Sequence, residues 1–189
     1  MSTNNVNLGA GNYAEEGTTG MFYHAPAGTA LPTYPGEELA AAWTEAGAIS
    51  EDGITLNTNH TFNQLKNWAN KIARLLPAEE SGTVGAPIID TTEESFNTIF
   101  GEDNVITTAA TASHGKLISV DVTPDSMPDP EAYLFLMKDG DDMMMIGTTK
   151  GYITELGEVA FQPNAAITWN ATITADKWRI LKDDGQVTG

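Results

Sequence analysis

The side chains with potential for catalysis or metal binding are histidines and carboxylates, because the chain of 189 residues contains no cysteine. The three histidines, His24, His60 and His114, are far apart in sequence, and none has a second histidine at the spacing of a zinc-binding helix. We therefore expect them at polar surface positions. The lack of cysteine excludes thiol chemistry and gives no information on redox compartment.

Acidic residues occur in short clusters, of which the pairs Glu15-Glu16, Glu79-Glu80 and Asp183-Asp184 are examples. Glycoside hydrolysis uses two carboxyl groups about 5 to 9.5 Å apart, but these pairs lie in polar, loop-like stretches where nothing would raise a pKa. Asp139-Gly140-Asp141-Asp142 begins like a calcium loop and lacks its later glycine and final glutamate. The sequence thus predicts no catalytic, cofactor-binding or metal-binding residue, and a protein that is not an enzyme.

Net charge is the strongest compositional feature. Twenty-six acidic residues against nine basic ones give −17, and this charge is divided almost evenly between the two halves of the chain. Such a surface repels phosphate, whereas nonspecific DNA binding depends on Lys and Arg. The longest apolar runs are far shorter than the ~20 residues of a membrane span. We expect a soluble protein that neither grips DNA nor enters a membrane.

Composition divides the chain into three parts. Residues 1–35 are rich in Asn, Gly and Thr and then in Pro, which favours an extended N-terminal arm. Within this arm, Gly9-Ala10-Gly11 lacks the strand and helix that a dinucleotide-binding loop requires. Residues 36–182 form the expected domain, and residues 183–189 form a short C-terminal tail. Residues 1–20 contain too few large apolar side chains to nucleate a core.

Two segments have features of short helices. In the first, apolar residues recur with helical spacing after Glu37 and Glu38, and Gly47 is placed to end the helix. The recurring residues are Leu39, Ala42, Trp43 and Ala46. In the second, Thr91 and Glu94 have capping-box spacing, and Gly101 is placed to end the helix in a left-handed conformation.

Residues 61–76 support two interpretations. Their large apolar side chains have approximately helical spacing, which favours a helix. The alternative is implied by the family resemblance described below: a turn near Trp68 followed by a strand over 71–76 that pairs with 84–89. We favour the strand, because Pro77-Ala78-Glu79-Glu80-Ser81-Gly82-Thr83-Val84-Gly85 has the composition of a loop between two strands.

The second half of the chain has the pattern of successive strands. Apolar residues alternate with polar ones in 118–122 and in 167–174, whereas 133–137 is apolar on both faces. Lys138 to Asp142 predicts a hairpin turn into 143–146. The fold class is therefore mainly β with short helices (α+β): an antiparallel β-sandwich or barrel flanked by one or two short α-helices.

Three further segments occur in a distinctive order. In Gly47-Ala48-Ile49-Ser50-Glu51-Asp52-Gly53-Ile54, the Asp-Gly pair predicts a tight turn with 48–50 and 54–56 as its arms. Trp68-Ala69-Asn70-Lys71 follows, and Glu94 to Val105 ends in Phe100-Gly101-Glu102-Asp103-Asn104-Val105. Together these segments resemble the major tail proteins, or tail tube subunits, of long-tailed non-contractile bacteriophages. The resemblance covers roughly residues 36–180, and one departure is that Ala69-Asn70 follows Trp68 where the family usually has Gly.

This resemblance implies a structural virion protein of the phage tail, made in the bacterial host cytoplasm. It implies homohexameric rings that stack helically into a tube, contacts with the tape measure and other tail proteins, and DNA that passes through the lumen during genome ejection without specific binding. We expect the arm 1–35 and the loop 77–85 to make inter-ring contacts. We also expect polar and acidic groups, rather than Lys66, Lys71 or Arg74, to dominate the lumen.

Two alternatives belong to other classes. A monomeric β-sandwich binding module for carbohydrate or a host surface would need an exposed aromatic platform, for which Tyr23, Tyr34 and Trp178 are the candidates. An acidic hydrolase would need a pocket that contains a carboxylate with a perturbed pKa.

Overall fold

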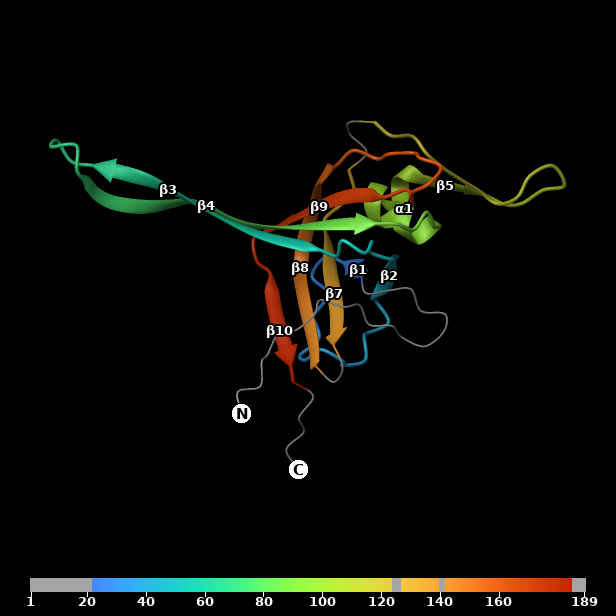
Figure 1. Cartoon of the computed structure of the whole chain (residues 1–189), viewed down its shortest axis with the longest axis horizontal. Helices are drawn as coiled ribbons and strands as arrows, with labels where there is room; N and C mark the ends of the chain where they lie inside the picture. The colour runs from blue at the N-terminus through green and yellow to red at the C-terminus, as the bar shows by residue number, and fades with distance from the viewer. Residues whose placement is uncertain (1–21, 124–126, 140–141, 185–189) are drawn as a thin grey trace, which may run out of the picture.

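The computed structural model describes residues 22–123, 127–139 and 142–184. Within these ranges the protein is an antiparallel β-sandwich with one short α-helix on one side and a long hairpin that leaves the body on the other (Figure 1). This architecture confirms the mainly β fold class. The elements are β1 (Phe22–Pro26), β2 (Thr44–Gly47), β3 (Thr55–Lys66), β4 (Ile72–Ile88), α1 (Glu93–Phe100), η1 (Glu102–Asn104), β5 (Val105–Thr108), β6 (Leu117–Val120), β7 (Glu131–Asp139), β8 (Asp142–Leu156), β9 (Trp169–Ala175) and β10 (Arg179–Asp183).

Strand β8 connects the two layers of the sandwich. Its first half pairs with β7 on one side and with β10 on the other, while its second half pairs with β9. The strand order along the sheet is β2-β1-β7-β8-β9-β4-β3, with β10 attached to β8. Strands β5 and β6 form a separate two-stranded sheet. The sheet thus folds over at β8 and encloses a core between its two halves.

The core is centred on three stacked aromatic rings. Phe22 stacks on Phe135 with ring centroids 4.5 Å apart and on Tyr133 at 6.0 Å. Leu134, between these two residues of β7, is also fully buried, in a second cluster that contains Trp43 and Met145. Strand β7 is therefore buried on both faces, as its continuous apolar run predicted.

The first described strand belongs to the sheet. β1 lies between β2 and β7, and Phe22 is completely buried. The aromatic part of the expected arm thus packs on its own domain, while residues 1–21 lie outside the described residues. The boundary between residues 35 and 36 stays a prediction.

The helix predicted after Glu37 is wrong. Residues 38–42 form turns and irregular chain, and Thr44–Gly47 is strand β2, paired with β1. Trp43 is buried, and it lies in the apolar cluster with Leu134 and Met145 rather than on a helix face. Pairing with β1 outweighs the weak intrinsic preference of this short segment for helix.

The Asp52-Gly53 turn is present, but its predicted arms are wrong. Gly53 has a φ of 69°, and its amide donates a hydrogen bond of 3.0 Å to the Ser50 carbonyl. The two flanking segments pair elsewhere: Ile49 bridges Ile88, and β3 begins at Thr55 and pairs with β4. The turn therefore joins neighbouring parts of one sheet instead of closing a small hairpin.

The strand interpretation of residues 71–76 is confirmed, and the loop predicted at 77–85 is wrong. β4 runs without interruption from Ile72 to Ile88. Residues 72–76 pair with β3 rather than with 84–89, so that Leu76 lies opposite Asn63. The Pro and Gly residues that indicated a loop are accommodated because the register shifts near Phe62, opposite Pro77.

Helix α1 begins one residue later than its sequence pattern predicted. The cap is Thr92, whose side chain accepts a hydrogen bond from the Ser95 amide, and the Ser95 hydroxyl accepts one from the Thr92 amide. Gly101 follows the helix with the predicted positive φ, at 87°, but its ψ of 141° lies outside the left-handed helical region. The capping box thus uses Thr92 and Ser95 in place of Thr91 and Glu94.

Candidate assembly interface

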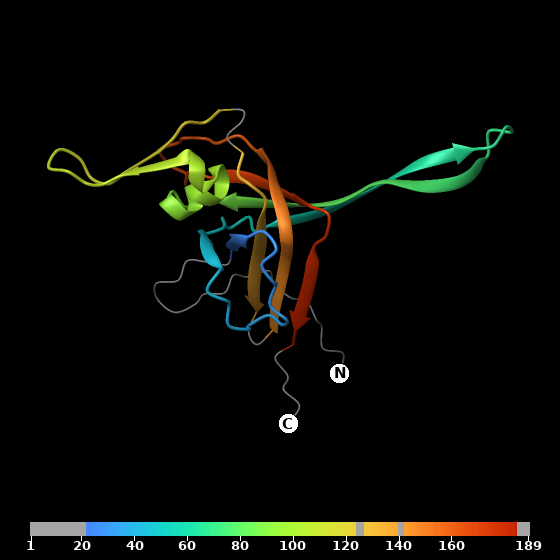
Figure 2. The same ribbon diagram turned by 180° about the vertical axis from the view of Figure 1, so that it is seen from behind.

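The most prominent surface feature is the β3–β4 hairpin. Its strands pair from Thr55 opposite Gly85 to Lys66 opposite Ile72. β4 also pairs with β9, but only from Gly82 to Ile88. Beyond Gly82 the two strands therefore pair only with each other among the described elements, and Figures 1 and 2 both show this part extending away from the body.

The turn at the tip is held by its own backbone. The Asn70 amide donates to the Asn67 carbonyl at 2.9 Å, and the Lys71 amide donates to the Asn67 side-chain oxygen at 3.0 Å. Asn70 has a φ of 58°, a conformation that asparagine tolerates better than most residues. This turn requires a left-handed backbone conformation after Trp68. Glycine adopts that conformation readily, and Asn70 provides it in this chain.

The tip exposes large apolar side chains. Trp68 is fully exposed, Leu65 is 52 % exposed and Ile72 is 55 % exposed. Scattered exposed apolar residues are ordinary, but these three lie within eight positions on a two-stranded projection. An indole that contacts nothing in the single chain offers a large contact area to a partner.

The same tip is basic in a strongly acidic protein. Lys66, Lys71 and Arg74 are exposed, and no Asp or Glu occurs between Asp52 and Glu79. None of the ion pairs between described residues involves these three cations. The hairpin tip thus combines positive charge with unburied apolar area.

The opposite end of the long axis, which we call the α1 end, contains α1, η1, the β5–β6 hairpin and residues 157–168 (Figure 1). Its centre is Trp169, whose ring meets Phe96 edge-on at 5.4 Å and Phe100 at 5.7 Å. Phe161 also meets this ring at 6.4 Å, yet it is 72 % exposed. Other large apolar side chains exposed at this end are Ile106, Leu117 and Val122.

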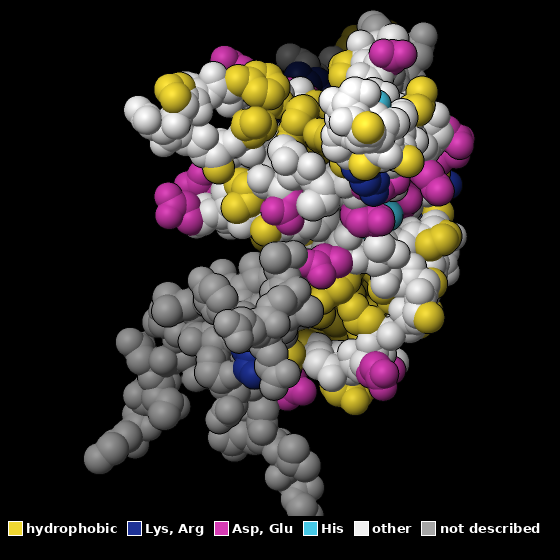
Figure 3. Space-filling view, turned by 90° about the vertical axis from the view of Figure 1, so that its right-hand side faces the viewer, with side chains coloured by type: hydrophobic (Ala, Val, Ile, Leu, Met, Phe, Trp, Pro, Cys, Tyr) yellow, Lys and Arg dark blue, Asp and Glu magenta, His cyan; other side chains and the backbone are white. Residues whose placement is uncertain are grey.

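The α1 end also carries exposed carboxylates. Glu94, Glu102 and Asp103 are exposed on α1 and η1. Figure 3, which looks onto this side of the molecule, shows acidic and hydrophobic side chains next to one another. The α1 end is therefore apolar and acidic, whereas the hairpin tip is apolar and basic.

Glu93 ties the helix to the β5–β6 hairpin. It forms an ion pair with Lys116, and its other oxygen accepts a hydrogen bond of 2.7 Å from the Thr107 hydroxyl. The Lys116 ammonium, and then the Thr107 hydroxyl, lower the pKa of the Glu93 carboxyl below its ordinary value. These contacts fix the β5–β6 hairpin relative to α1.

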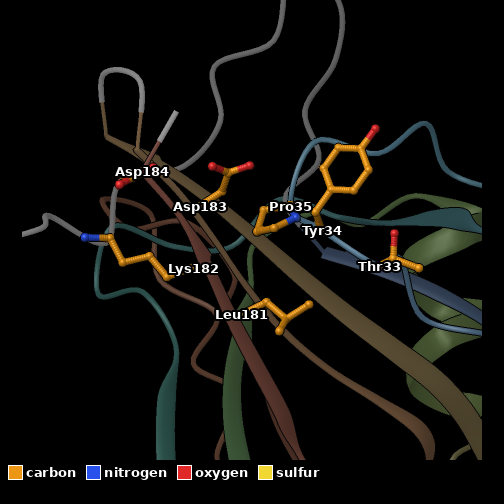
Figure 4. Close-up of a pocket in the computed structure, with 7 residues that line it drawn as sticks. All are labelled: Thr33, Tyr34, Pro35, Leu181, Lys182, Asp183 and Asp184. Carbon is orange, nitrogen blue, oxygen red and sulfur yellow. The ribbon is translucent and has the colours of Figure 1, made fainter. Parts of the chain in front are cut away.

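Three strands at the margins of the sheet keep one side unpaired among the described residues. β2 pairs only with β1, β3 only with β4, and β10 only with β8. Beside β10 lies a pocket of about 470 Å³, between residues 33–35 and the end of the strand (Figure 4). Unpaired margins with exposed residues such as Ile180 are positions where a further strand can add.

The residues considered for chemistry do not assemble into a site. His24 pairs with Glu131 at 2.9 Å, and exposed His114 contacts the Gly115 carbonyl. The part of the chain described contains no group of three His, Asp or Glu residues that could hold a metal ion. The pair Glu15-Glu16, residues 140–141 of the calcium-like segment, and the side chains of His60, Glu79 and Glu80 lie outside the described residues.

The three candidate platform aromatics are not equivalent. Trp178 is partly buried against the core, where its indole donates a hydrogen bond of 2.9 Å to the Gly82 carbonyl. Tyr23 is half-buried in β1, and Tyr34 is 53 % exposed beside β10. Trp178 therefore does not provide the exposed platform that the alternative of a binding module would need.

The sequence did not predict the hairpin tip as a surface. The large apolar residues of 61–76 have approximately helical spacing, and this spacing does not show that they are exposed. The available signal was charge: the three basic residues of 1–95 all lie in 66–74, in a stretch without carboxylates.

Comparisons with known proteins identify the family of the chain. A family model described as phage tail tube protein matches residues 12–178, which is most of the chain. The chain belongs to the phage tail tube protein family. A search of curated protein sequences returned no match. Among solved structures, the cap that terminates the tube of the anti-feeding prophage, determined by cryo-electron microscopy, is similar over 97 % of this chain and 100 % of that chain, with 10 % identity and a TM-score of 0.46.

Family membership identifies a structural protein of the phage tail, with a non-enzymatic role in assembly. As a member of the tail tube family, the protein is expected in the virion. Within the described residues, no helix has the length and apolar composition needed to cross a membrane. The functional surfaces are therefore those that contact other subunits.

Proposed function

We propose that this tail tube family protein self-associates into rings, hexameric as the family resemblance implies, that stack into the tube of a long-tailed non-contractile phage. Membership of the family supports this proposal. The observation that carries it is the β3–β4 hairpin, which exposes Trp68 and two other large apolar side chains in the isolated chain. Such a projection gains stability when a neighbouring subunit covers it.

Lateral contacts would use the strand margins. β3 and β10 each offer one unpaired side, and addition of strands between copies would convert these aggregation-prone margins into the ring contact. Repetition of one such contact between identical subunits closes a ring when the rotation between neighbours matches the symmetry.

The acidity of the chain would keep the bore from holding DNA. Six copies of −17 give −102 per ring. Because the Debye length is about 8 Å in physiological salt, only residues that line the channel act on the duplex. Polar and acidic groups would line the lumen, and Lys66, Lys71 and Arg74 would take part in contacts between subunits, so that DNA passes during ejection without specific binding.

Made in the host cytoplasm, the subunits would assemble with the tape measure and other tail proteins.

Negative-stain microscopy and light scattering of the purified protein over a concentration series test this function. Rings or tubes roughly a hundred ångströms wide, at about the size of six copies, are the expected result. A protein that stays monomeric at the highest concentration, also after addition of tape measure protein, would contradict it and would favour the monomeric binding module.

A further inference from the structure

We propose that the hairpin tip of one copy docks on the α1 end of a second copy. The proposal rests on the self-association stated above and adds the two surfaces that meet. The hairpin tip consists of Leu65, Lys66, Trp68, Lys71, Ile72 and Arg74. Its acceptor comprises the exposed carboxylates Glu94, Glu102 and Asp103 with the exposed apolar residues Ile106, Val122 and Phe161.

The charges of the two surfaces are complementary. Residues 53–78 contain three basic residues and no Asp or Glu, whereas residues 89–115, which follow β4, contain five acidic residues and no Lys or Arg. The hairpin carries the basic block away from the body. Opposite potentials at two separate surfaces steer copies into contact and fix which surfaces meet.

The apolar side chains of the two surfaces are also complementary. Trp68 is fully exposed at one end and Phe161 is 72 % exposed at the other. Aromatic side chains bury about 150–250 Å² each and are frequent at the centres of interfaces. The basic residues of the hairpin tip and the exposed carboxylates of the α1 end would form the polar rim of such a contact.

The geometry makes this contact intermolecular. The hairpin tip and the α1 end lie at opposite ends of the longest axis (Figures 1 and 2), so the tip cannot reach the α1 end of its own chain. The eight residues from Asn59 to Lys66 extend roughly 25 Å beyond the body at the usual rise of a strand. A contact between two different surfaces of identical chains propagates from copy to copy, which is the symmetry that rings and helical stacks require.

Charge reversal at each surface tests the docking. In one variant, Lys66, Lys71 and Arg74 are each replaced by Glu; in the other, Glu94, Glu102 and Asp103 are each replaced by Lys. Each variant alone should lose assembly at concentrations where the wild type assembles, because like charges then face each other. An equimolar mixture of the two, and a single chain with all six substitutions, should assemble again. The six-substitution chain has the wild-type net charge and is the matched control.

Several outcomes would overturn the docking. If the hairpin variant assembles as the wild type does, the tip is not a contact, although the proposed tube stands. If neither the mixture nor the six-substitution chain assembles, while circular dichroism shows that the variants are natively folded, the tip has another acceptor. If the wild type binds a DNA duplex through Lys66, Lys71 and Arg74 and remains monomeric, the hairpin is a nucleic-acid contact.

The lack of native cysteine allows a direct measurement that does not require rings. Asn67→Cys in one copy and Asp103→Cys in another should react with a short bismaleimide to give a mixed dimer, and Lys138→Cys in place of Asp103→Cys should not. Cross-linked dimers without rings would support the docking while contradicting the tube. Equal cross-linking to both positions, or none to either, would contradict the docking.

Discussion

The indole of Trp178 lies directly against the α-carbon of Gly82. A Cβ at Gly82 would lie 2.4 Å from a carbon of the Trp178 ring, whose nitrogen donates a hydrogen bond of 2.9 Å to the Gly82 carbonyl. Gly82 is also the residue where β4 parts from β9 and the free section of the hairpin begins. The contact therefore fixes the base of the hairpin against the corner between β9 and β10.

We expect Gly82→Ala to lower the free energy of unfolding by about 1–3 kcal/mol, because the added methyl group must displace a packed ring. Chemical denaturation provides the measurement. Gly115→Ala is the matched control, since a Cβ there meets nothing within 4 Å, and it should leave stability nearly unchanged. Equal stability of the two variants would show that Trp178 moves freely at this position.

Tyr133 buries a hydroxyl that has no hydrogen-bond partner among the described residues. We expect Tyr133→Phe to raise the free energy of unfolding by roughly 1 kcal/mol at neutral pH, because an unpaired buried polar group is unfavourable. Denaturant titration of both proteins measures the difference. A loss of stability would instead reveal a partner for the hydroxyl.

The same residue predicts alkaline sensitivity. Burial, and then the charge of Glu131, raise the pKa of Tyr133 above its ordinary value. The pKa of Tyr133 is higher in the folded protein than in the unfolded chain, so the unfolded chain loses this proton first. The free energy of unfolding is therefore unaffected by this group below about pH 10 and declines as the pH rises further. Tyr133→Phe should show a weaker decline in unfolding free energy above pH 10 than the wild type.

For Glu93 the pH dependence of stability has the opposite direction: its contribution is lost at acidic pH. Its pKa is lowered by Lys116 and Thr107, so the stabilisation is present above the ordinary glutamate pKa of about 4.3 and is lost as the pH falls through the lowered value. Carbon-13 NMR of the Glu93 carboxyl should show this low pKa. In Lys116→Met it should move toward 4.3, while an unchanged value would show that Thr107 alone holds it.

The cap of α1 offers a paired test within neighbouring residues. Thr92 makes the capping hydrogen bonds, so Thr92→Ala should reduce the free energy of unfolding by about 1 kcal/mol. Thr91→Ala removes the same groups one position earlier, where the sequence had placed the cap, and should change it by less than about 0.5 kcal/mol. The reverse order of effects in thermal or chemical unfolding would contradict the observed cap.

The sequence predicted the fold best where local pattern and tertiary environment agree. Alternation in 167–174 and the continuous apolar run in 133–137 predicted β9 and β7, because one face or both faces of these strands are buried. The segment from Leu39 to Ala46 has helical spacing but lies beside β1, and the pairing of β2 with that strand determines its conformation. Periodicity alone carries no information on such a neighbour.

The candidate interface was predictable only in part. The turn near Trp68 was expected from the family resemblance, but the length of the hairpin depends on β4 continuing through Pro77 and Gly82, both of which indicate loops in isolation. Nor does the spacing of Leu65, Trp68 and Ile72 distinguish residues buried in a core from residues exposed for a partner. That distinction depends on the rest of the fold, which leaves this part of the hairpin without a neighbour.

The free margin of β10 gives the last prediction, which concerns lateral contacts. Ile180 is 52 % exposed on this strand, and charged residues on marginal strands oppose strand addition. Ile180→Lys should therefore reduce ring formation. Because the side chain is already half in water, the free energy of unfolding should change by less than about 0.5 kcal/mol. Light scattering and microscopy report the assembly, and denaturation reports the stability. Rings that form at wild-type concentrations despite the lysine would show that β10 faces outward in the assembly, and would leave the marginal strands β2 and β3 as candidates for the lateral contact.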